Sequence, residues 1–388
     1  MPLILSPMRY LDYAATTPVL PEVTDAMVGV LRGDFGNPSS VHAYGRAARE
    51  IVEDARDRVA SAVGASPAEI VFTGGGTEAD NLAIKGAARK LRGNGNHVIT
   101  TAFEHHAVLD TVEWLGHNGF EATVLPVGPD GLVDPAEVAA AVRPSTLLVS
   151  VMAVNNEIGT AQPLAEIVRA VKDTNPSTLV HTDAVQMLGN LPVDVHEMGL
   201  DFAAFSAHKF GGPKGVGFLF ARSHTPVEAL LHGGGHEGGL RSGTLNVPGL
   251  AGLGVAAEIA VKEVDHKVER VGALRTRLWQ GIEASIEGVR LNGHPTKRVP
   301  GTLNVSFEGA DGETLLLLFD AAGIACSAGS ACQSGAIDPS HVLLAIGVPR
   351  EIAKGSVRFS LGRESNDEDV DAVLEALPGI VESARKVG

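Results

Sequence analysis

Cysteine is scarce in this chain: among 388 residues there are only two, Cys326 and Cys332. A secreted domain stapled by disulfides carries several pairs, and a reducing compartment keeps lone thiols free. Neither thiol has a CxxC or HxxxH partner nearby, and His341 is the one imidazole close to them in the sequence, so the two make a poor zinc site. We therefore expect no disulfide framework and no bound metal.

Aromatic residues, basic charge and long apolar runs are also in short supply. Phe, Trp and Tyr make up 4% of the chain and all hydrophobic residues together 44%, which is typical of a globular protein. The formal net charge of -15 at pH 7 opposes direct binding to nucleic acid, because a phosphate backbone would be repelled. No apolar stretch approaches the roughly 18 residues of a membrane span, and the first residues lack the pattern of a signal peptide. We expect a cytoplasmic protein with no membrane partner.

What the sequence contains instead is a regular alternation, from about residue 68 to 220, of short apolar runs with amphipathic or alanine-rich segments. EIVFTGGG is followed by TEADNLAIKGAARK, and HVITTAF is followed by HHAVLDTVEWL. Continuously apolar runs of this length are typical of parallel strands buried on both faces, with helices in the connections. The pattern predicts an α/β fold with a mostly parallel central sheet flanked by helices, whose ligands collect beyond the carboxyl ends of the strands.

The last third of the chain has a different order of elements. A long helical pattern near residue 260 is followed by the strand-like runs GTLNVSFEG and GSVRFSLGR and by a final helix, DEDVDAVLEAL. This order predicts a smaller α+β domain. We expect a large domain over residues 15–261 and a small domain made of residues 1–14 and 262–388.

Polar residues follow two of the predicted strands. Gly76 and Thr77 end the run TGGGT and begin a helix, where bare glycine and free helix N–H groups favour a phosphate. An ordinary strand-to-helix turn with Thr77 as N-cap explains these residues equally well. Asp183 and Gln186 end another strand, where an acid holds a protonated ring nitrogen and an amide donates to an oxygen. A plain polar strand end is the alternative.

Lys209 comes directly after another buried run, DFAAFSAH. A lysine is most often a solvated surface charge. Desolvation at the carboxyl end of a core strand lowers the pKa of a lysine and favours Schiff-base formation. Lys214, further along the same turn, is the solvated alternative.

Eight motifs stand in an order found in one family: TGGGTEADN, FEHHAVLD, VNNEIGT, HTDAVQ, SAHKFGGPKGVG, GGGHEGGLRSGT, GSACQSG and RFSLGR. The chain resembles cysteine desulfurases of the NifS/IscS type, which are pyridoxal phosphate (PLP) enzymes of the class V aminotransferase group. The resemblance runs from LDYAATTP at residue 11 to the last strand near residue 363. It implies the PLP-dependent transferase fold of type I.

The resemblance also implies how the chain holds PLP. Lys209 would bind the cofactor as an imine, Asp183 would pair with the pyridine nitrogen, and Gln186 would donate to the ring hydroxyl. His105 would stack on the ring and assist proton transfer, with its neighbour His106 as the less favoured candidate.

The phosphate of PLP is assigned by the same resemblance. Gly76, Thr77, Ser206 and His208 would hold it. In this family a threonine from the partner subunit completes the phosphate site, and it matches Thr244. The resemblance therefore implies a homodimer.

For the substrate, the resemblance implies that Arg358 binds the carboxylate of L-cysteine. A guanidinium group suits a carboxylate because it offers two parallel donors. Asn155 would lie near both the ring and the substrate, and Asn37 would assist. Without the resemblance, Arg358 reads as a surface charge beside a strand and Asn155 as a turn residue.

The two cysteines differ in their surroundings. Cys332 stands among Gly, Ser and Ala residues typical of a solvent-reachable loop, whereas Cys326 follows AAGIA and is expected to be buried and unreactive. The family nucleophile falls on Cys332. The resemblance thus implies conversion of L-cysteine to L-alanine, with sulfur transferred to Cys332 as a persulfide and passed to an iron-sulfur scaffold or another sulfur-acceptor protein.

Other functions remain open on the same fold. An aminotransferase would have no need of Cys332, and a selenocysteine-specific lyase would not process cysteine. A sulfur-carrier scaffold without turnover is the non-enzymatic alternative. The joint presence of Lys209, Asp183, His105 and Cys332 argues against that scaffold.

Overall fold

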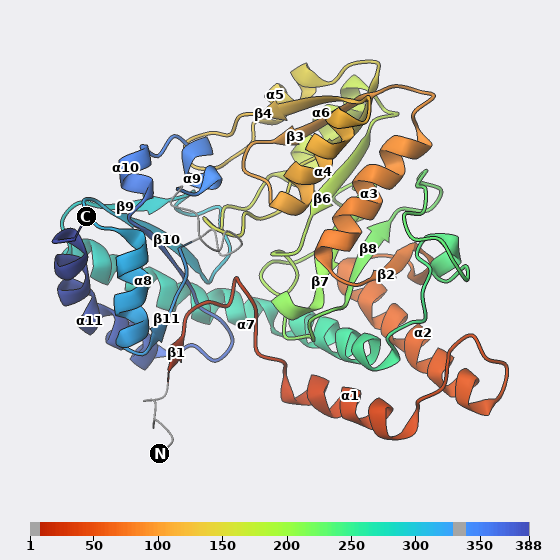
Figure 1. Cartoon of the computed structure of the whole chain (residues 1–388), viewed down its shortest axis with the longest axis horizontal. Helices are drawn as coiled ribbons and strands as arrows, with labels where there is room; N and C mark the ends of the chain where they lie inside the picture. Colours follow the sequence, from red (N-terminus) through yellow and green to blue (C-terminus); the bar gives the residue numbers. More distant parts are fainter. Residues whose placement is uncertain (1–7, 329–338, 388) are drawn as a thin grey trace.

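The computed structural model describes residues 8–328 and 339–387. Its largest element is a seven-stranded sheet (Figure 1). The strands are Ile70–Thr73 (β2), His97–Thr101 (β3), Glu121–Leu125 (β4), Thr146–Ser150 (β5), Leu179–Asp183 (β6), Phe202–Ser206 (β7) and Gly217–Ala221 (β8). Their spatial order is β2-β8-β7-β6-β5-β3-β4, and only β8 runs antiparallel to its neighbours in this sheet. The predicted α/β fold with a mostly parallel sheet is confirmed.

Helices cover both faces of this sheet because successive strand residues point to opposite sides. In β2, Val71 packs in the cluster that includes Leu82 and Val108, whereas Ile70 and Phe72 pack in the cluster on the other face. The α-helices in this part of the chain are Pro21–Gly33 (α1), Ala43–Val63 (α2), Gly76–Lys90 (α3), His106–His117 (α4), Pro135–Ala141 (α5) and Leu164–Thr174 (α6). Short 3-10 turns are Pro67–Glu69 (η1), Ala207–Lys209 (η2) and, after the last strand of the sheet, Glu237–Gly239 (η3).

The long helix α7 (Val247–Ser285) leads to a small antiparallel sheet of order β12-β10-β9 (Figure 1). The strand β1 pairs in parallel with β11 in a separate two-stranded sheet, and the residue Asp12 that follows β1 forms a bridge to Ser360 of β12, so this segment lies beside the small sheet. The remaining elements are Arg9–Tyr10 (β1), Val289–Asn292 (β9), Thr302–Phe307 (β10), Gly312–Ala321 (α8), Ile324–Ala325 (β11), His341–Ala345 (α9), Arg350–Ala353 (α10), Ser356–Ser360 (β12) and Asp367–Arg385 (α11).

The predicted domain boundary at residue 261 falls inside α7. Leu11 and Val271 belong to the hydrophobic cluster of the small sheet, and Ala260 belongs to a cluster of the large sheet. Val342 of α9 follows the boundary in sequence but packs with the large-sheet cluster. The two-domain division stays a prediction.

The carboxyl ends of parallel strands lie at one edge of the large sheet, which is where such folds bind ligands. β6 ends at Asp183 and β7 at Ser206, while α3 begins at Gly76. Residues that the sequence separates by more than a hundred positions are thus brought to one edge. Across 8–328 and 339–387, none of the helices combines the length and the apolar character that crossing a membrane requires.

Candidate active site

A cavity of about 340 Å³ lies at this carboxyl edge, and residues of both sheets line it. Its volume is in the range of small-molecule sites, roughly 300–1,000 Å³. The structure brings nine of the predicted binding residues to it: Gly76, Thr77, His105, Asp183, Gln186, Ser206, His208, Lys209 and Arg358.

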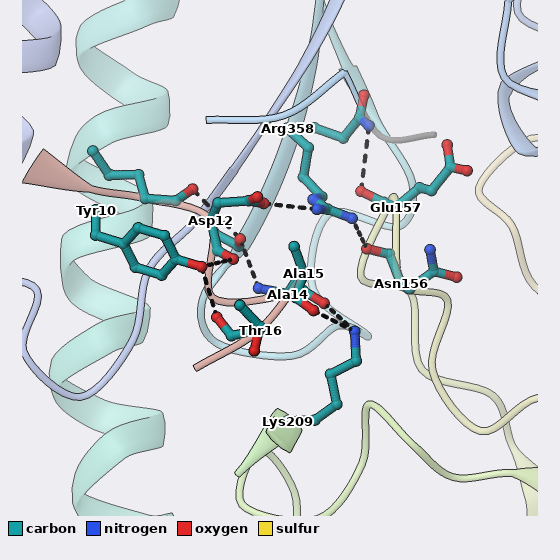
Figure 2. Close-up of polar contacts among 12 residues, drawn as sticks. Tyr10, Asp12, Ala14, Ala15, Thr16, Asn156, Glu157, Lys209 and Arg358 are labelled. Atoms are coloured by element: carbon teal, nitrogen blue, oxygen red, sulfur yellow. Dashed lines mark hydrogen bonds and ion pairs between the residues drawn. The ribbon is translucent and has the colours of Figure 1, made fainter. Parts of the chain in front are cut away.

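Lys209 ends the short turn η2, directly after β7. Its Nζ donates hydrogen bonds to the carbonyl oxygens of Ala14 at 2.8 Å and Ala15 at 2.9 Å (Figure 2). These carbonyls hold the amine at the cavity, so Lys209 is not a solvated surface charge. Lys214, the solvated alternative, is exposed.

Asp183 is buried as the last residue of β6. Burial raises the pKa of its carboxyl, while the nearby His105 and Lys209 act in the opposite direction. A protonated ring nitrogen would supply the positive partner that a desolvated carboxylate needs. Beside it, Gln186 Nε2 donates to the Ala14 carbonyl at 2.9 Å and keeps a second N–H for a ligand oxygen.

His105 is the N-cap of α4, where its Nδ1 accepts the backbone N–H of Ala107 at 3.1 Å. A nitrogen that accepts carries no proton, so the neutral ring has its proton on Nε2. Burial lowers the pKa of His105, against the opposing influence of Asp183. The side chain therefore offers an Nε2–H donor at the cavity wall. Its stacking on a ring stays a prediction.

The start of α3 forms the anion-binding part of the cavity. The N-cap is Gly75, which has no side chain to cap the helix, so the interpretation of Thr77 as N-cap is wrong. The first N–H groups of α3 and the hydroxyls of Thr77 and Ser206 together suit a phosphate. A Cβ on Gly76 would lie 2.5 Å from Cγ2 of Val185, so glycine is needed for this close packing.

An outer cavity of about 760 Å³ adjoins the same helix start. His208 and Lys214 line it together with Thr77 and Ser206. The Nδ1 of His208 lies 3.1 Å from the Thr16 hydroxyl, and burial lowers the pKa of His208 to about 4, so its ring is neutral. Lys214 adds a positive charge here that the sequence did not lead us to expect.

Arg358 lies in β12 with only 2% of its surface exposed, so the surface-charge interpretation is wrong. Its two terminal nitrogens donate to Oδ1 of Asp12 at 2.8 Å and to the carbonyl of Asn156 at 2.9 Å (Figure 2). Its Nε is buried without a hydrogen-bond partner in the described part of the chain. An unpartnered buried donor favours an anion that completes its hydrogen bonds.

His341 is a cavity residue that the sequence analysis had considered only as a possible metal ligand. It begins α9, and its Nε2 lies 2.9 Å from the carbonyl oxygen of Glu104, which makes Nε2 the protonated nitrogen. Its ring centroid is 5.0 Å from that of His106. The only sequence signal for this residue was its position nine places after Cys332.

Asp80 is a second lining residue without a predicted role. Its Oδ1 is 3.3 Å from Nε2 of His181, and neither atom makes a hydrogen bond in the described structure. The distance is that of an ion pair, but burial raises the pKa of Asp80 and lowers the pKa of His181 to about 3, so burial opposes the charged form of both side chains. His181 is fixed on its other side, with Nδ1 2.8 Å from the Ser150 hydroxyl.

Asn155 does not line the cavity, although it was predicted near the ring and substrate. Its Nδ2 donates to the Phe103 carbonyl at 2.8 Å, and its Oδ1 accepts the N–H groups of Glu157 and Ile158 at 2.9 and 3.1 Å. These bonds shape the loop from within, and the adjacent Asn156 lines the cavity. A direct role for Asn155 stays a prediction.

Two further predicted residues, Asn37 and Thr244, are not brought to the cavity of this chain. Both are exposed and line neither the inner nor the outer cavity. Cys332 lies outside the described residues. Cys326 is half-buried, and burial raises the pKa of its thiol to about 12, which fits an unreactive cysteine.

Glu104, next to His105, is a fully buried carboxyl group. Its Oε1 accepts from the Thr101 hydroxyl at 2.6 Å and from the Met152 N–H at 2.8 Å. Burial raises the pKa of Glu104 from 4.5 to about 8. The folded protein keeps this proton up to about pH 8, whereas the unfolded chain loses it near pH 4.5. The free energy of unfolding therefore falls as pH rises across this window, by at most about 1.4 kcal/mol per pH unit.

Glu104→Gln should remove this pH dependence, because glutamine keeps an accepting oxygen and has no acidic proton. We expect the free energy of unfolding of the variant, relative to wild type, to increase from about pH 5 to about pH 8. Urea titrations across this range measure it, with the exposed Glu137→Gln as control. A difference that does not change with pH would contradict the raised pKa of Glu104.

The residues of the inner cavity fit PLP. A buried carboxylate, an amine and an uncapped helix start with two hydroxyls match the ring nitrogen, aldehyde and phosphate of the cofactor. Within 8–328 and 339–387 no group of three or more His, Cys, Asp or Glu side chains could hold a metal ion. The amine, the carboxyl group and the two hydroxyls named above are the groups that suit an organic cofactor with a phosphate.

The fold and this site define a PLP-dependent enzyme of fold type I. The chain belongs to the class-V aminotransferase family, which matches residues 9–373, and its relatives are cysteine desulfurases of the NifS/IscS type. Cysteine desulfurase IscS of Dictyoglomus turgidum is 47% identical over 97% of this chain and 95% of the relative. The protein of that name from Methanosarcina thermophila is 48% identical over 97% and 93%.

Solved structures agree with these relatives. A NifS-like protein superposes with a TM-score of 0.92 at 41% identity and covers 97% of this chain and 100% of its own. SspA in complex with cysteine superposes with a TM-score of 0.81 at 37% identity and covers 91% and 98%. The resemblance inferred from the motifs is confirmed.

Proposed function

We propose that this protein is a PLP-dependent cysteine desulfurase that converts L-cysteine to L-alanine and transfers the sulfur to Cys332 as a persulfide. The observation that carries this proposal is the presence of Lys209, Asp183, His105 and Arg358 on one cavity of about 340 Å³. The relatives carry the name cysteine desulfurase, and the similar SspA was solved with cysteine.

Arg358 makes the site selective for an amino acid. Asp12 and the Asn156 carbonyl fix the orientation of its guanidinium group, and its Nε has no partner among the described residues. A substrate carboxylate would supply the missing acceptor. Because the side chain is buried, water competes little with that carboxylate.

PLP, when bound, supplies an electron sink for the α-carbon of the substrate. Asp183 keeps the ring nitrogen protonated, and we assign movement of the α-proton to Nζ of Lys209. The carbonyls of Ala14 and Ala15 accept hydrogen bonds from this amine and thereby orient it at the cavity. His105 carries its proton on Nε2 and is the donor we assign to the substrate side.

The sulfur step is assigned to Cys332 on sequence grounds. Its thiolate forms an S–S bond with the substrate sulfur while the substrate C–S bond breaks. The electron pair of the C–S bond stays with the carbon fragment, which takes up protons and leaves as alanine. The only other thiol of the chain, Cys326, has its pKa raised by burial to about 12 and is a poor nucleophile.

We further propose a homodimer in which the partner subunit's Thr244 completes the phosphate site. Thr244 is exposed and lines neither the inner nor the outer cavity of its own chain. A second copy would also cover the exposed apolar side chains around the α1–α2 connection, which are Leu31, Phe35, Val41 and Tyr44. A monomeric mass of the cofactor-loaded protein in sedimentation equilibrium would contradict the homodimer.

The persulfide sulfur would pass to an acceptor protein, for which we propose an iron-sulfur scaffold because the relatives are IscS proteins. The cytoplasm is the proposed location, since its reducing conditions keep both thiols reduced. A selenocysteine lyase is the competing activity. Comparing L-cysteine with L-selenocysteine as substrates separates the two, because a selenocysteine-specific lyase would leave L-cysteine unchanged.

Cys332→Ala is expected to lower sulfide release from L-cysteine by roughly a thousandfold or more, because the sulfur then has no nucleophile to accept it. The variant should keep the visible absorbance of bound PLP. The assay measures sulfide and alanine with a reductant present. Cys326→Ala is the matched control and should retain activity within about twofold. Full sulfide release by Cys332→Ala would overturn the assignment of the nucleophile.

A further inference from the structure

A second cavity, of about 370 Å³, lies beside the active site. Lys209 is the one described residue that lines both cavities. The segment 13–21 forms one wall, held in place because the Leu20 N–H donates to the Gly211 carbonyl at 3.0 Å and the Gly211 N–H donates to the Thr17 hydroxyl at 2.8 Å. The second cavity is therefore a separate space with a fixed wall.

One face of α7 gives this cavity an apolar end and a charged end. The helix residues that line the cavity lie on three successive turns: Ile259 and Ala260 on the first, Glu263 on the second and Lys267 on the third. From the first to the last of them the helix rises about 12 Å. At the apolar end Ala260 and Phe210 both lie beside Gly189, and at the charged end Arg363 binds Glu263 at 2.8 Å. The lining thus changes from apolar to charged along the helix.

Lys267 is a cation without a close partner at the charged end. No hydrogen bond or ion pair involves it in the described part of the chain. Glu263 is already bound to Arg363, and Arg270 donates to three backbone carbonyls. Burial lowers the pKa of Lys267 to about 8, even though Glu263 acts to raise it. An ammonium group in such a place is stabilised by a bound anion.

The charged end is also the end that opens to solvent. An outer pocket of about 490 Å³ continues from it. Lys262 and His266 line only the outer pocket, and the residues that line both the outer pocket and the second cavity are Pro21, Glu263, Lys267, Arg363 and Glu364. A ligand would therefore reach Lys267 from outside without passing through the active site.

We propose that this cavity binds a small monocarboxylate with an apolar body, its carboxylate at Lys267 and Arg363 and its body against Ile259, Ala260 and Phe210. Glu263 and Glu364 also line this cavity, so a free amino acid is the competing ligand, and a titration with L-alanine compares the two. Inorganic phosphate fits poorly, because it would leave the apolar end unfilled. An extended chain of about six carbons is shorter than this helix face of about 12 Å and therefore fits along it.

Calorimetric titration of the holoenzyme with sodium hexanoate tests the site. We expect saturable binding to wild type, weakened at least about tenfold in Lys267→Met, because a charge-assisted hydrogen bond is lost and the aliphatic stem is kept. Lys262→Met is the matched control and should bind within about twofold of wild type, since Lys262 pairs with Glu258 on the surface. No saturable binding, or equal affinity of wild type and Lys267→Met, would refute the proposal.

A second measurement uses only the wild-type protein and therefore does not depend on the folding of a variant. Acetylation of lysines by acetic anhydride near pH 8 is followed by peptide mapping with and without hexanoate. Hexanoate should slow the acetylation of Lys267 and leave that of Lys262 unchanged. Equal labelling of Lys267 in both samples would argue against the site. Neither measurement depends on desulfurase activity, so the two proposals stand or fall separately.

Discussion

Lys209→Ala is expected to lower alanine and sulfide production by roughly a thousandfold or more and to leave PLP without a covalent link to the protein. Both effects follow from the loss of one amine, which is the proposed attachment point of the cofactor and the proposed base at the α-carbon. The fold should persist, because Gln186 still donates to the Ala14 carbonyl and Thr17 still binds Gly211.

Lys214→Ala is the matched control for this variant. Lys214 is the neighbouring lysine in the same turn, but it lines only the outer cavity. Borohydride reduction followed by peptide mass spectrometry locates the cofactor. We expect PLP on the peptide of Lys209 in wild type and in Lys214→Ala, and no covalent PLP in Lys209→Ala. PLP attached to Lys214 would contradict the assignment of the amine.

The strand-end part of the site could be predicted from the sequence because its position follows from local pattern. Asp183, Ser206 and Lys209 come directly after continuously apolar runs, and parallel strands carry their carboxyl ends to one edge of the sheet. The structure places all three at the same cavity. Hydrophobic periodicity and the β-α-β order were sufficient for this part.

The surroundings of Arg358 could not be predicted in this way, because they depend on pairings between distant segments. Asp12 binds Arg358 across 346 positions of sequence, and its bridge to Ser360 of β12 brings this N-terminal segment to the small sheet. No local pattern encodes such a contact. The sequence therefore suggested a surface residue where the structure has a buried ion pair.

The Asn155 and Asn156 pair shows a second limit. The motif VNNEIGT predicted a polar residue at the cavity, but the sequence does not say which of two adjacent amides faces it. The loop geometry decides: Asn155 accepts two backbone N–H groups of the turn, and Asn156 lines the cavity. Side-chain direction in an irregular loop depends on its hydrogen bonds, which have no period in the sequence.

Arg358→Lys is expected to raise KM for L-cysteine by about a hundredfold and to change kcat less. Lysine keeps the positive charge but has one nitrogen in place of three. Its three N–H donors radiate from one atom and do not reproduce the planar guanidinium group that reaches Asp12, the Asn156 carbonyl and a substrate carboxylate from separate nitrogens. Steady-state rates of alanine formation give both constants.

The role of Arg358 in carboxylate binding is separated from a structural role by a substrate without a carboxylate. Wild type should prefer L-cysteine strongly over cysteamine, and Arg358→Lys should lose most of this preference because only L-cysteine uses the guanidinium group. Arg9→Lys is the matched control: it alters an Arg–Asp pair of the same part of the fold, at 2.9 Å to Asp369, and Arg9 does not line the cavity. That control should keep the preference. If Arg358→Lys weakened the use of both substrates equally, the buried pair with Asp12 would be structural, and carboxylate binding would have to be assigned to another residue.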